Sequence, residues 1–131
     1  MIFLDTDILI NYFKGNKNIQ SALLKHLQNG EDICTTTLNV YEIVKGFKYI
    51  GSEKKIKKLE TFLNEIEVFN LNNQSMVEAA EIFTNLKKAG KTIGDMDILI
   101  ATIVMQNNGI LVSNNTRHFK NIQELQLTNW M

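Results

Sequence analysis

The chain has 131 residues, which is enough for one domain with a buried core and too few for a second core of comparable size. Lysine plus arginine equals aspartate plus glutamate at 14 each, so the overall charge does not indicate a polyanionic partner. Contact with a nucleic acid would then depend on a local basic surface or a bound metal ion. The single cysteine, Cys34, excludes an internal disulfide and a zinc site built from cysteines. We expect one domain over residues 1–131.

The first residues do not resemble a signal peptide, because no basic segment precedes the apolar run and Asp5 follows it at once. No apolar stretch approaches the roughly 20 residues that a membrane-spanning helix needs. The sequence therefore predicts a cytoplasmic protein with no membrane partner.

Apolar spacing predicts the elements of the first half of the chain. Residues 2–4 form a short apolar run that is typical of a buried strand, and Thr6 and Asp7 then mark the start of a helix. The expected elements before residue 67 are a strand over 2–4, helices over 8–13 and 19–27, a strand over 33–35, a helix that follows Thr36 and Thr37, and a charged amphipathic helix over 54–66.

In the second half, residues 98–105 are apolar almost all the way round, which predicts a central buried helix. The preceding helix, over 77–86, is expected to turn Ala79, Ala80 and Phe83 toward the core. The other expected elements are strands over 68–71, 110–112 and 125–128, a connector over 89–94 and a loop over 113–117. Strands that alternate with helices indicate parallel strands joined by crossovers, and so a three-layer α/β fold with a mainly parallel central sheet.

Three carboxylates have apolar surroundings: Asp5 follows the first strand, Glu42 lies within Val-Tyr-Glu-Ile-Val, and Asp97 precedes Ile-Leu-Ile-Ala. A buried carboxylate costs several kcal/mol unless it is protonated, paired or bound to a metal ion. Hard oxygen ligands without an adjoining histidine or cysteine suit Mg²⁺ or Mn²⁺ better than Zn²⁺. The three acids together favour a metal site.

Each acid taken alone also has an ordinary structural explanation. Asp5 and Asp7 are typical helix caps, and Glu42 is compatible with a half-exposed helix position. Asp95 and Asp97 are compatible with first-turn acids that complement a helix dipole. Their side chains point about 200° apart on a helix, so they do not both serve one site through helical geometry. Asp97 aligns with apolar residues, and Asp95 caps the helix or reaches the site from the loop.

Four segments, taken in order, resemble the PIN-domain nucleases, and most closely the VapC-type toxins of bacterial and archaeal toxin–antitoxin pairs. The segments are Phe-Leu-Asp-Thr-Asp at 3–7, Tyr-Glu-Ile-Val-Lys-Gly at 41–46, Gly-Asp-Met-Asp-Ile-Leu-Ile-Ala at 94–101 and Leu-Val-Ser-Asn-Asn-Thr-Arg-His-Phe at 111–119. The resemblance implies a PIN-like fold, hydrolysis of RNA that depends on Mg²⁺ or Mn²⁺, a cognate antitoxin protein as partner, and a homodimer.

The family pattern places its first three acids on Asp5, Glu42 and Asp97. Asp5 and Asp97 are then expected to bind the metal ion, directly or through water, while Glu42 binds it or handles the attacking water. The family's fourth acid falls on Asn115, which brings no charge and so puts full occupancy of a second metal in doubt. Asp7 stands where the family often has Asn or Ser, and it partly restores that charge.

Polar and basic residues complete the site that the resemblance implies. Thr37 and Ser113 match polar positions that line family sites. Arg117, the only arginine, is the preferred phosphate contact, and Lys45 and Lys48 are further candidates for RNA binding. A solvated helix face explains equally well the run of lysines to which these two belong, namely Lys45, Lys48, Lys54, Lys55, Lys57 and Lys58. His26 and His118 are expected to be surface or packing residues.

Two other functions compete with the nuclease. A phosphatase of the haloacid dehalogenase type also begins with an apolar strand and Asp-x-Asp. Its strand ending in Ser or Thr should precede the Gly-Asp loop, but here Leu111-Val112-Ser113 comes after it. The second competitor is a catalytically weak PIN-like binding module, which the loss of charge at Asn115 favours.

Overall fold

The computed structural model describes residues 1–131 and has one central five-stranded sheet. Its strand order is β3-β2-β1-β4-β5, and every neighbouring pair is parallel, so the predicted mainly parallel sheet is fully parallel. The strands are β1 (Ile2–Leu4), β2 (Ile33–Thr36), β3 (Glu67–Phe69), β4 (Ile110–Val112) and β5 (Gln126–Thr128).

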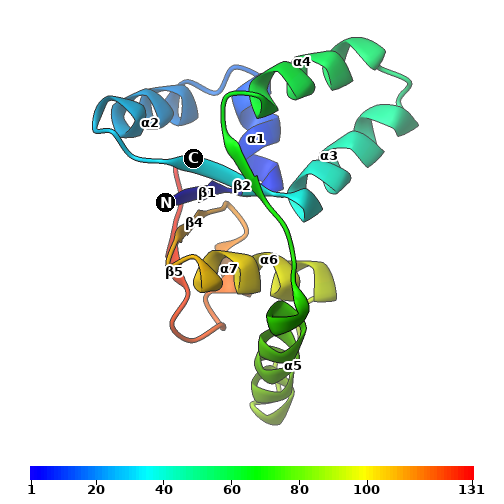
Figure 1. The fold of residues 1–131 in the computed structure, drawn as a ribbon, viewed down its shortest axis with the longest axis vertical. Helices are drawn as coiled ribbons and strands as arrows, with labels where there is room; N and C mark the ends of the chain where they lie inside the picture. Colours follow the sequence, from blue (N-terminus) through cyan, green and yellow to red (C-terminus); the bar gives the residue numbers. More distant parts are fainter.

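Helices cover both faces of this sheet, which confirms the predicted three-layer α/β fold (Figure 1). Helices α1 to α4 lie on one face and α5 to α7 on the other (Figure 1). The helices are α1 (Thr6–Phe13), α2 (Lys17–Gln28), α3 (Thr37–Tyr49), α4 (Glu53–Leu63), α5 (Asn73–Lys88), α6 (Asp95–Gln106) and α7 (Thr116–Phe119). None of them has the length and apolarity that crossing a lipid bilayer requires.

The alternation of side chains along the short strands divides the core between the two faces of the sheet. Phe3 and Leu111 belong to the cluster beneath α5, α6 and α7, whereas Leu4 and Val112 belong to the cluster beneath α1 to α4. All four side chains are fully buried. Helix α6 is buried along most of its length, as predicted for residues 98–105, because it packs between the sheet and α5.

The predicted inward face of helix α5 is partly wrong. Ala79 is buried as predicted, but Ala80 is exposed and the Phe83 side chain is 46% exposed. The helix has two apolar stripes, and the one that packs on α6 runs through Ala79 and Leu86. Several boundaries also differ: α4 ends at Leu63, β3 spans 67–69, and the predicted loop over 113–117 passes into α7 at Thr116.

The order of the strands fixes where a site can form. From β1 the chain adds β2 and β3 on one side, and it later places β4 and β5 on the other side. Open parallel sheets bind ligands outside the carboxyl ends of the strands at such a change of direction. Asp5 directly follows β1 and Ser113 directly follows β4, so both lie at this position.

Candidate active site

Asp5 is the most buried acid of the chain, with 6% of its surface exposed. It occupies the N-cap position of α1, but its side chain makes no capping hydrogen bond, so capping does not explain it. Instead, Oδ1 accepts a hydrogen bond from Asn39 Nδ2 at 2.9 Å, and Oδ2 accepts one from Ser113 Oγ at 2.7 Å. Burial raises the pKa of Asp5 to about 6, the Ser113 hydroxyl lowers it, and the charges of Asp7 and Asp97 raise it further.

A chain of hydrogen bonds links Asp5 to Glu42. The buried amide of Asn39 donates to Asp5 and to Thr6 Oγ1, the latter at 3.0 Å, and Thr6 Oγ1 donates to Glu42 Oε1 at 2.8 Å. Thr36 Oγ1 in turn donates to Asn39 Oδ1 at 2.7 Å and fixes the amide orientation. Glu42, which is half-buried on α3, is therefore held at a set position relative to Asp5.

Asp7 lies in the first turn of α1 and has one satisfied and one unsatisfied oxygen. Oδ2 accepts a hydrogen bond from the Asn114 backbone amide at 3.0 Å, whereas the buried Oδ1 has no hydrogen-bond partner. Burial raises the pKa of Asp7, and the backbone amides of the 113–115 segment and of α1 oppose this. A buried oxygen without a partner is costly, and a cation would satisfy it.

Asp97 and Asp95 point in different directions, as the helical geometry predicted. Asp97 is partly buried, and its Oδ2 lies 3.6 Å from Nδ1 of His118 on α7, whereas Asp95 is exposed. The Asn115 side chain makes no hydrogen bond with an acid: its Nδ2 lies 3.2 Å from His118 Nδ1. The Asn115 backbone amide donates to Ser113 Oγ and also lowers the pKa of Asp7.

The donor set fits a hard divalent cation, although it is not a closed metal cage. Asp5, Asp7 and Asp97 lie within electrostatic reach of one another, and no lysine or arginine pairs with them. No three acidic, histidine or cysteine side chains lie close enough to hold an ion by themselves. Carboxylate oxygens with remaining water ligands are the environment that Mg²⁺ prefers, and the buried Oδ1 of Asp7, which has no hydrogen-bond partner, is available as a further oxygen donor.

The chain matches the PIN domain family over residues 2–125. It belongs to the PIN-domain family. Ribonuclease VapC2 of Haemophilus influenzae is 32% identical over 129 residues, which cover 98% of this chain and 96% of the relative. Ribonuclease VapC2 of Rickettsia felis is 30% identical over 128 residues, which cover 97% of this chain and 96% of the relative. The structure of VapBC2 from Rickettsia felis, bound to a DNA fragment from their promoter, superposes with a TM-score of 0.90 at 28% identity and covers both chains completely.

These likenesses confirm the predicted family and fold, and the prediction of a PIN-domain ribonuclease of the VapC toxin kind. They also remove the competing phosphatase, because the PIN match spans the motifs on which that alternative depended. The roles of individual residues in this PIN domain stay predictions.

Among the predicted polar and basic residues, Ser113 contacts an acid, whereas Arg117, Lys45 and Lys48 form no ion pair with the acids. Arg117 is exposed on α7, and Lys45 and Lys48 are exposed on α3. Lys45 Nζ lies 5.1 Å from the ring centroid of Tyr41, so its side chain is held along the helix surface. Thr37 donates to Asn70 Oδ1 at 3.0 Å and is directed toward the end of β3, away from the acids.

Sequence reasoning missed two residues that hydrogen-bond to the candidate acids, Thr6 and Asn39, whereas His118 is exposed, as predicted. Thr6 lies between two candidate acids in the sequence, and this position could have identified it as a site residue. Asn39 is a polar residue between apolar neighbours, two positions after a run of three threonines, and this pattern was the second available signal. The structure buries Asn39 completely. No local pattern identifies His118, because its nearness to Asp97 depends on the packing of α7 beside α6.

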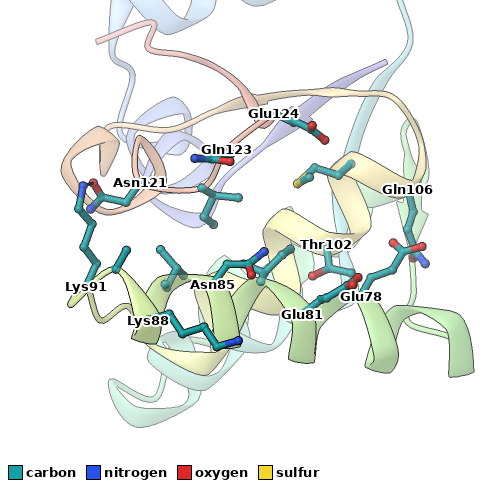
Figure 2. Close-up of a pocket in the computed structure, with 15 residues that line it drawn as sticks. Glu78, Glu81, Asn85, Lys88, Lys91, Thr102, Gln106, Asn121, Gln123 and Glu124 are labelled. Atoms are coloured by element: carbon teal, nitrogen blue, oxygen red, sulfur yellow. Dashed lines mark hydrogen bonds between the residues drawn. The ribbon is translucent and has the colours of Figure 1, made fainter.

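A cavity of the PIN domain lies away from the acids. It has a volume of about 830 Å³ and lies between α5, the carboxyl-terminal half of α6 and the segment before β5 (Figure 2). Glu78 and Glu81 line one end, and Lys91 closes the other, where its Nζ donates to Asn121 at 3.1 Å (Figure 2). None of the predicted site residues lines this cavity, so it does not compete as the nuclease site.

Proposed function

We propose that residues 1–131 form one PIN-like nuclease domain that hydrolyses RNA phosphodiester bonds with Mg²⁺ or Mn²⁺, as the toxin of a toxin–antitoxin pair in the cytoplasm. The observation that carries this proposal is the set of three acids at the carboxyl edge of the sheet. Asp5 has a raised pKa, Asp7 has a buried oxygen without a partner, and Asp97 lies within their reach. Such a site lacks positive charge, and a divalent cation supplies it.

In this proposal Asp5 and Asp97 hold the metal ion, and Asp7 adds negative charge beside them. The bound ion lowers the pKa of an attacking water and neutralises charge on the scissile phosphate. Ser113 and Asn39 hold the Asp5 carboxylate in one orientation through their hydrogen bonds. The products are a 5′-phosphate and a 3′-hydroxyl.

Glu42 acts on the water in this mechanism. Its Oε1 is occupied by the Thr6 hydroxyl, which leaves Oε2 to accept a hydrogen bond from the attacking water and to take its proton. Arg117, Lys45 and Lys48 supply phosphate contacts around the site, since all three are exposed and none is paired with an acid.

Withdrawal of the metal ion tests the proposal. RNA cleavage by the purified protein should stop in EDTA and return when Mg²⁺ or Mn²⁺ is added in excess, because the acids alone cannot offset charge on the phosphate. Gel analysis of an end-labelled structured RNA measures the rate and identifies the 5′-phosphate. Equal cleavage in EDTA would exclude the metal mechanism. RNA binding with no cleavage under any metal would instead support the catalytically weak PIN-like binding module.

We propose two protein partners: a cognate antitoxin, supported by the similarity to VapBC2, and a second copy of the chain. The second copy is supported by the exposed stripe of α5, which contains Met76, Val77, Ala80 and Phe83. Two antiparallel copies of α5 related by a two-fold axis would bury this stripe against itself.

Phe83→Glu should weaken the homodimer at least tenfold, because a charge buried in an apolar contact costs several kcal/mol. Leu24→Glu is the matched control, since Leu24 is 57% exposed on α2, on the other face of the sheet. Sedimentation velocity over a concentration series measures both dissociation constants. Equal dissociation constants for the two variants would move the dimer contact away from α5.

A further inference from the structure

Helix α3 contains a glycine that the folded chain itself does not require. Gly46 is exposed inside the helix, it does not have a positive φ, and a Cβ at this position would meet no atom within 4 Å. Glycine destabilises a helix interior relative to alanine, because it loses more backbone freedom on folding. Backbone conformation and internal packing therefore do not explain Gly46. A glycine in such a position lets another molecule approach the backbone closely.

The side of α3 that carries Gly46 leads away from the proposed site. Helical geometry places Glu42 and Tyr49 within about 40° and 60° of Gly46 around the helix axis. Glu42 handles the water in the proposed mechanism, and Tyr49, one turn beyond Gly46, has a side chain that is 93% exposed. Lys45 borders this side, with its Nζ 5.1 Å from the Tyr41 ring centroid. The face formed by Glu42, Lys45, Gly46 and Tyr49 is called the α3 face below.

The charge around the α3 face suits a polyanion. Residues 41–60, which contain most of α3 and the start of α4, have six lysines and three acids, a net charge of +3. The rest of the chain has eight basic residues and eleven acids, a net charge of −3. Helix α4 and the end of α3 lie at the opposite end of the molecule from α5, so this face is separate from the α5 stripe (Figure 1).

The residue types favour RNA over a protein as the occupant of this face. Lysine is depleted in the buried centres of protein–protein interfaces. Lysines that contact phosphates beside an exposed aromatic ring that stacks on a base are typical of surfaces that bind single-stranded nucleic acid. Tyr49 and Lys45 supply these two groups next to Glu42.

We infer that a single-stranded segment of the RNA substrate lies along the α3 face, with one unpaired base stacked on Tyr49. The inference rests on the proposed nuclease function and specifies the form of RNA that the site takes. Gly46 admits the sugar–phosphate backbone close to the helix, and Lys45 contacts a phosphate. The bases of a duplex are stacked on one another and cannot reach the ring, so duplex RNA binds more weakly.

Gly46→Ala should move stability and RNA binding in opposite directions. The melting temperature should rise by roughly 1–5 °C, because alanine restricts the unfolded chain and meets no atom in the folded one. The dissociation constant for a short fluorescent single-stranded RNA should rise by about fivefold or more, because the added methyl group meets the RNA backbone. Anisotropy in EDTA, where the proposed mechanism leaves the RNA uncut, measures this constant.

Gly46→Leu extends the series and should weaken RNA binding further than Gly46→Ala. Ser21→Leu is the matched control, because it adds the same side chain to an exposed position on α2 and should leave the dissociation constant within about twofold. Wild-type RNA affinity in both Gly46 variants would overturn the inference. A purely structural role for Gly46 would change the melting temperature alone.

Tyr49→Ala tests the stacking of a base. The dissociation constant for the single-stranded RNA should rise about tenfold, whereas that for the same RNA annealed to its complement should change less than about twofold. Tyr49→Phe keeps the ring and should bind both RNAs like the wild type. Because Tyr49 is 93% exposed, neither substitution disturbs the core. Equal affinity of the wild-type protein for single-stranded and duplex RNA would also overturn the inference.

The binding measurements need no cleavage, so the inference and the proposed function can fail separately. The expected losses of binding, together with no cleavage by the wild type in Mg²⁺ or Mn²⁺, would overturn the nuclease and leave the RNA surface in place. Metal-dependent cleavage with wild-type RNA affinity in Gly46→Leu and Tyr49→Ala would do the reverse. If these variants weaken only the homodimer in sedimentation velocity, the α3 face binds a second copy of the chain, and the inference is wrong.

Discussion

Asp97→Asn is expected to lower the rate of RNA cleavage by about a hundredfold or more, whereas Asp95→Asn lowers it by less than about threefold. The two acids are neighbours on α6, have the same chemistry and lie two positions apart. Asp97 is partly buried within electrostatic reach of Asp5, and in the proposed mechanism the loss of its charge removes a metal ligand. Asp95 is exposed and points away, so its loss changes only the local potential.

This pair is a matched comparison, because each variant removes one charge from the same helix turn. Initial rates on a fluorescent RNA at saturating Mn²⁺ give the effect on turnover, and titration calorimetry gives the effect on metal affinity. Equal losses of activity in the two variants would show that α6 does not present Asp97 to the site. Unchanged activity in Asp97→Asn would remove Asp97 from the metal site altogether.

Asp5→Asn should abolish cleavage and at the same time raise the melting temperature of the metal-free protein at pH 7. The folded protein holds an ionised Asp5 in a buried position near two other acids, and this costs free energy. The amide removes that charge and keeps both contacts, because its oxygen accepts from Asn39 and its nitrogen donates to Ser113. The expected gain is about 1–3 kcal/mol, or several degrees.

The gain should depend on pH in a definite direction. The pKa of Asp5 is about 6 in the folded protein and 3.8 as the ordinary value, so between these values the folded state binds more protons than the unfolded state. Rising pH therefore destabilises the wild-type protein relative to Asp5→Asn until about pH 6, and the difference is then constant. Below about pH 4 both states of the wild type carry a neutral Asp5, and the two proteins should converge.

Thermal melts in EDTA from pH 4 to pH 8 measure this difference. Asp95→Asn is again the control, and its melting curve should follow the wild type because Asp95 is exposed. A melting temperature for Asp5→Asn at or below that of the wild type at pH 7.5 would contradict the prediction. Asp5 would then be stabilised by contacts that the amide does not reproduce.

The local sequence pattern was enough to predict the layers of this fold and the position of its candidate acids. The apolar runs at 2–4 and 110–112 and the apolar helix over 98–105 can be satisfied only by burial between two layers. A carboxylate directly after a buried parallel strand must lie at the carboxyl edge of the sheet, so the sequence alone places Asp5 there. The separation of Asp95 from Asp97 followed from helical geometry alone.

The detailed surroundings of each acid depended on residues far apart in the chain. Ser113 bonds to Asp5 across 108 positions, and Asn39 reaches it across 34, so no local pattern contains either contact. His118 comes near Asp97 only because α7 follows β4, the strand beside β1. The Asp7 oxygen without a partner is likewise a property of packing.

Helix α5 shows the limit of apolar periodicity in the same terms. Its sequence has two apolar stripes. A 3.6-residue period identifies an apolar stripe on a helix, but it does not identify the element that packs against that stripe. The contact with α6 buries the stripe through Ala79 and Leu86 and leaves Ala80 and Phe83 exposed. The sequence by itself determined the order of the elements, their alternation and the set of candidate acids. Only the tertiary structure decided which faces are covered and which polar groups meet, because long-range packing selects among locally equivalent arrangements.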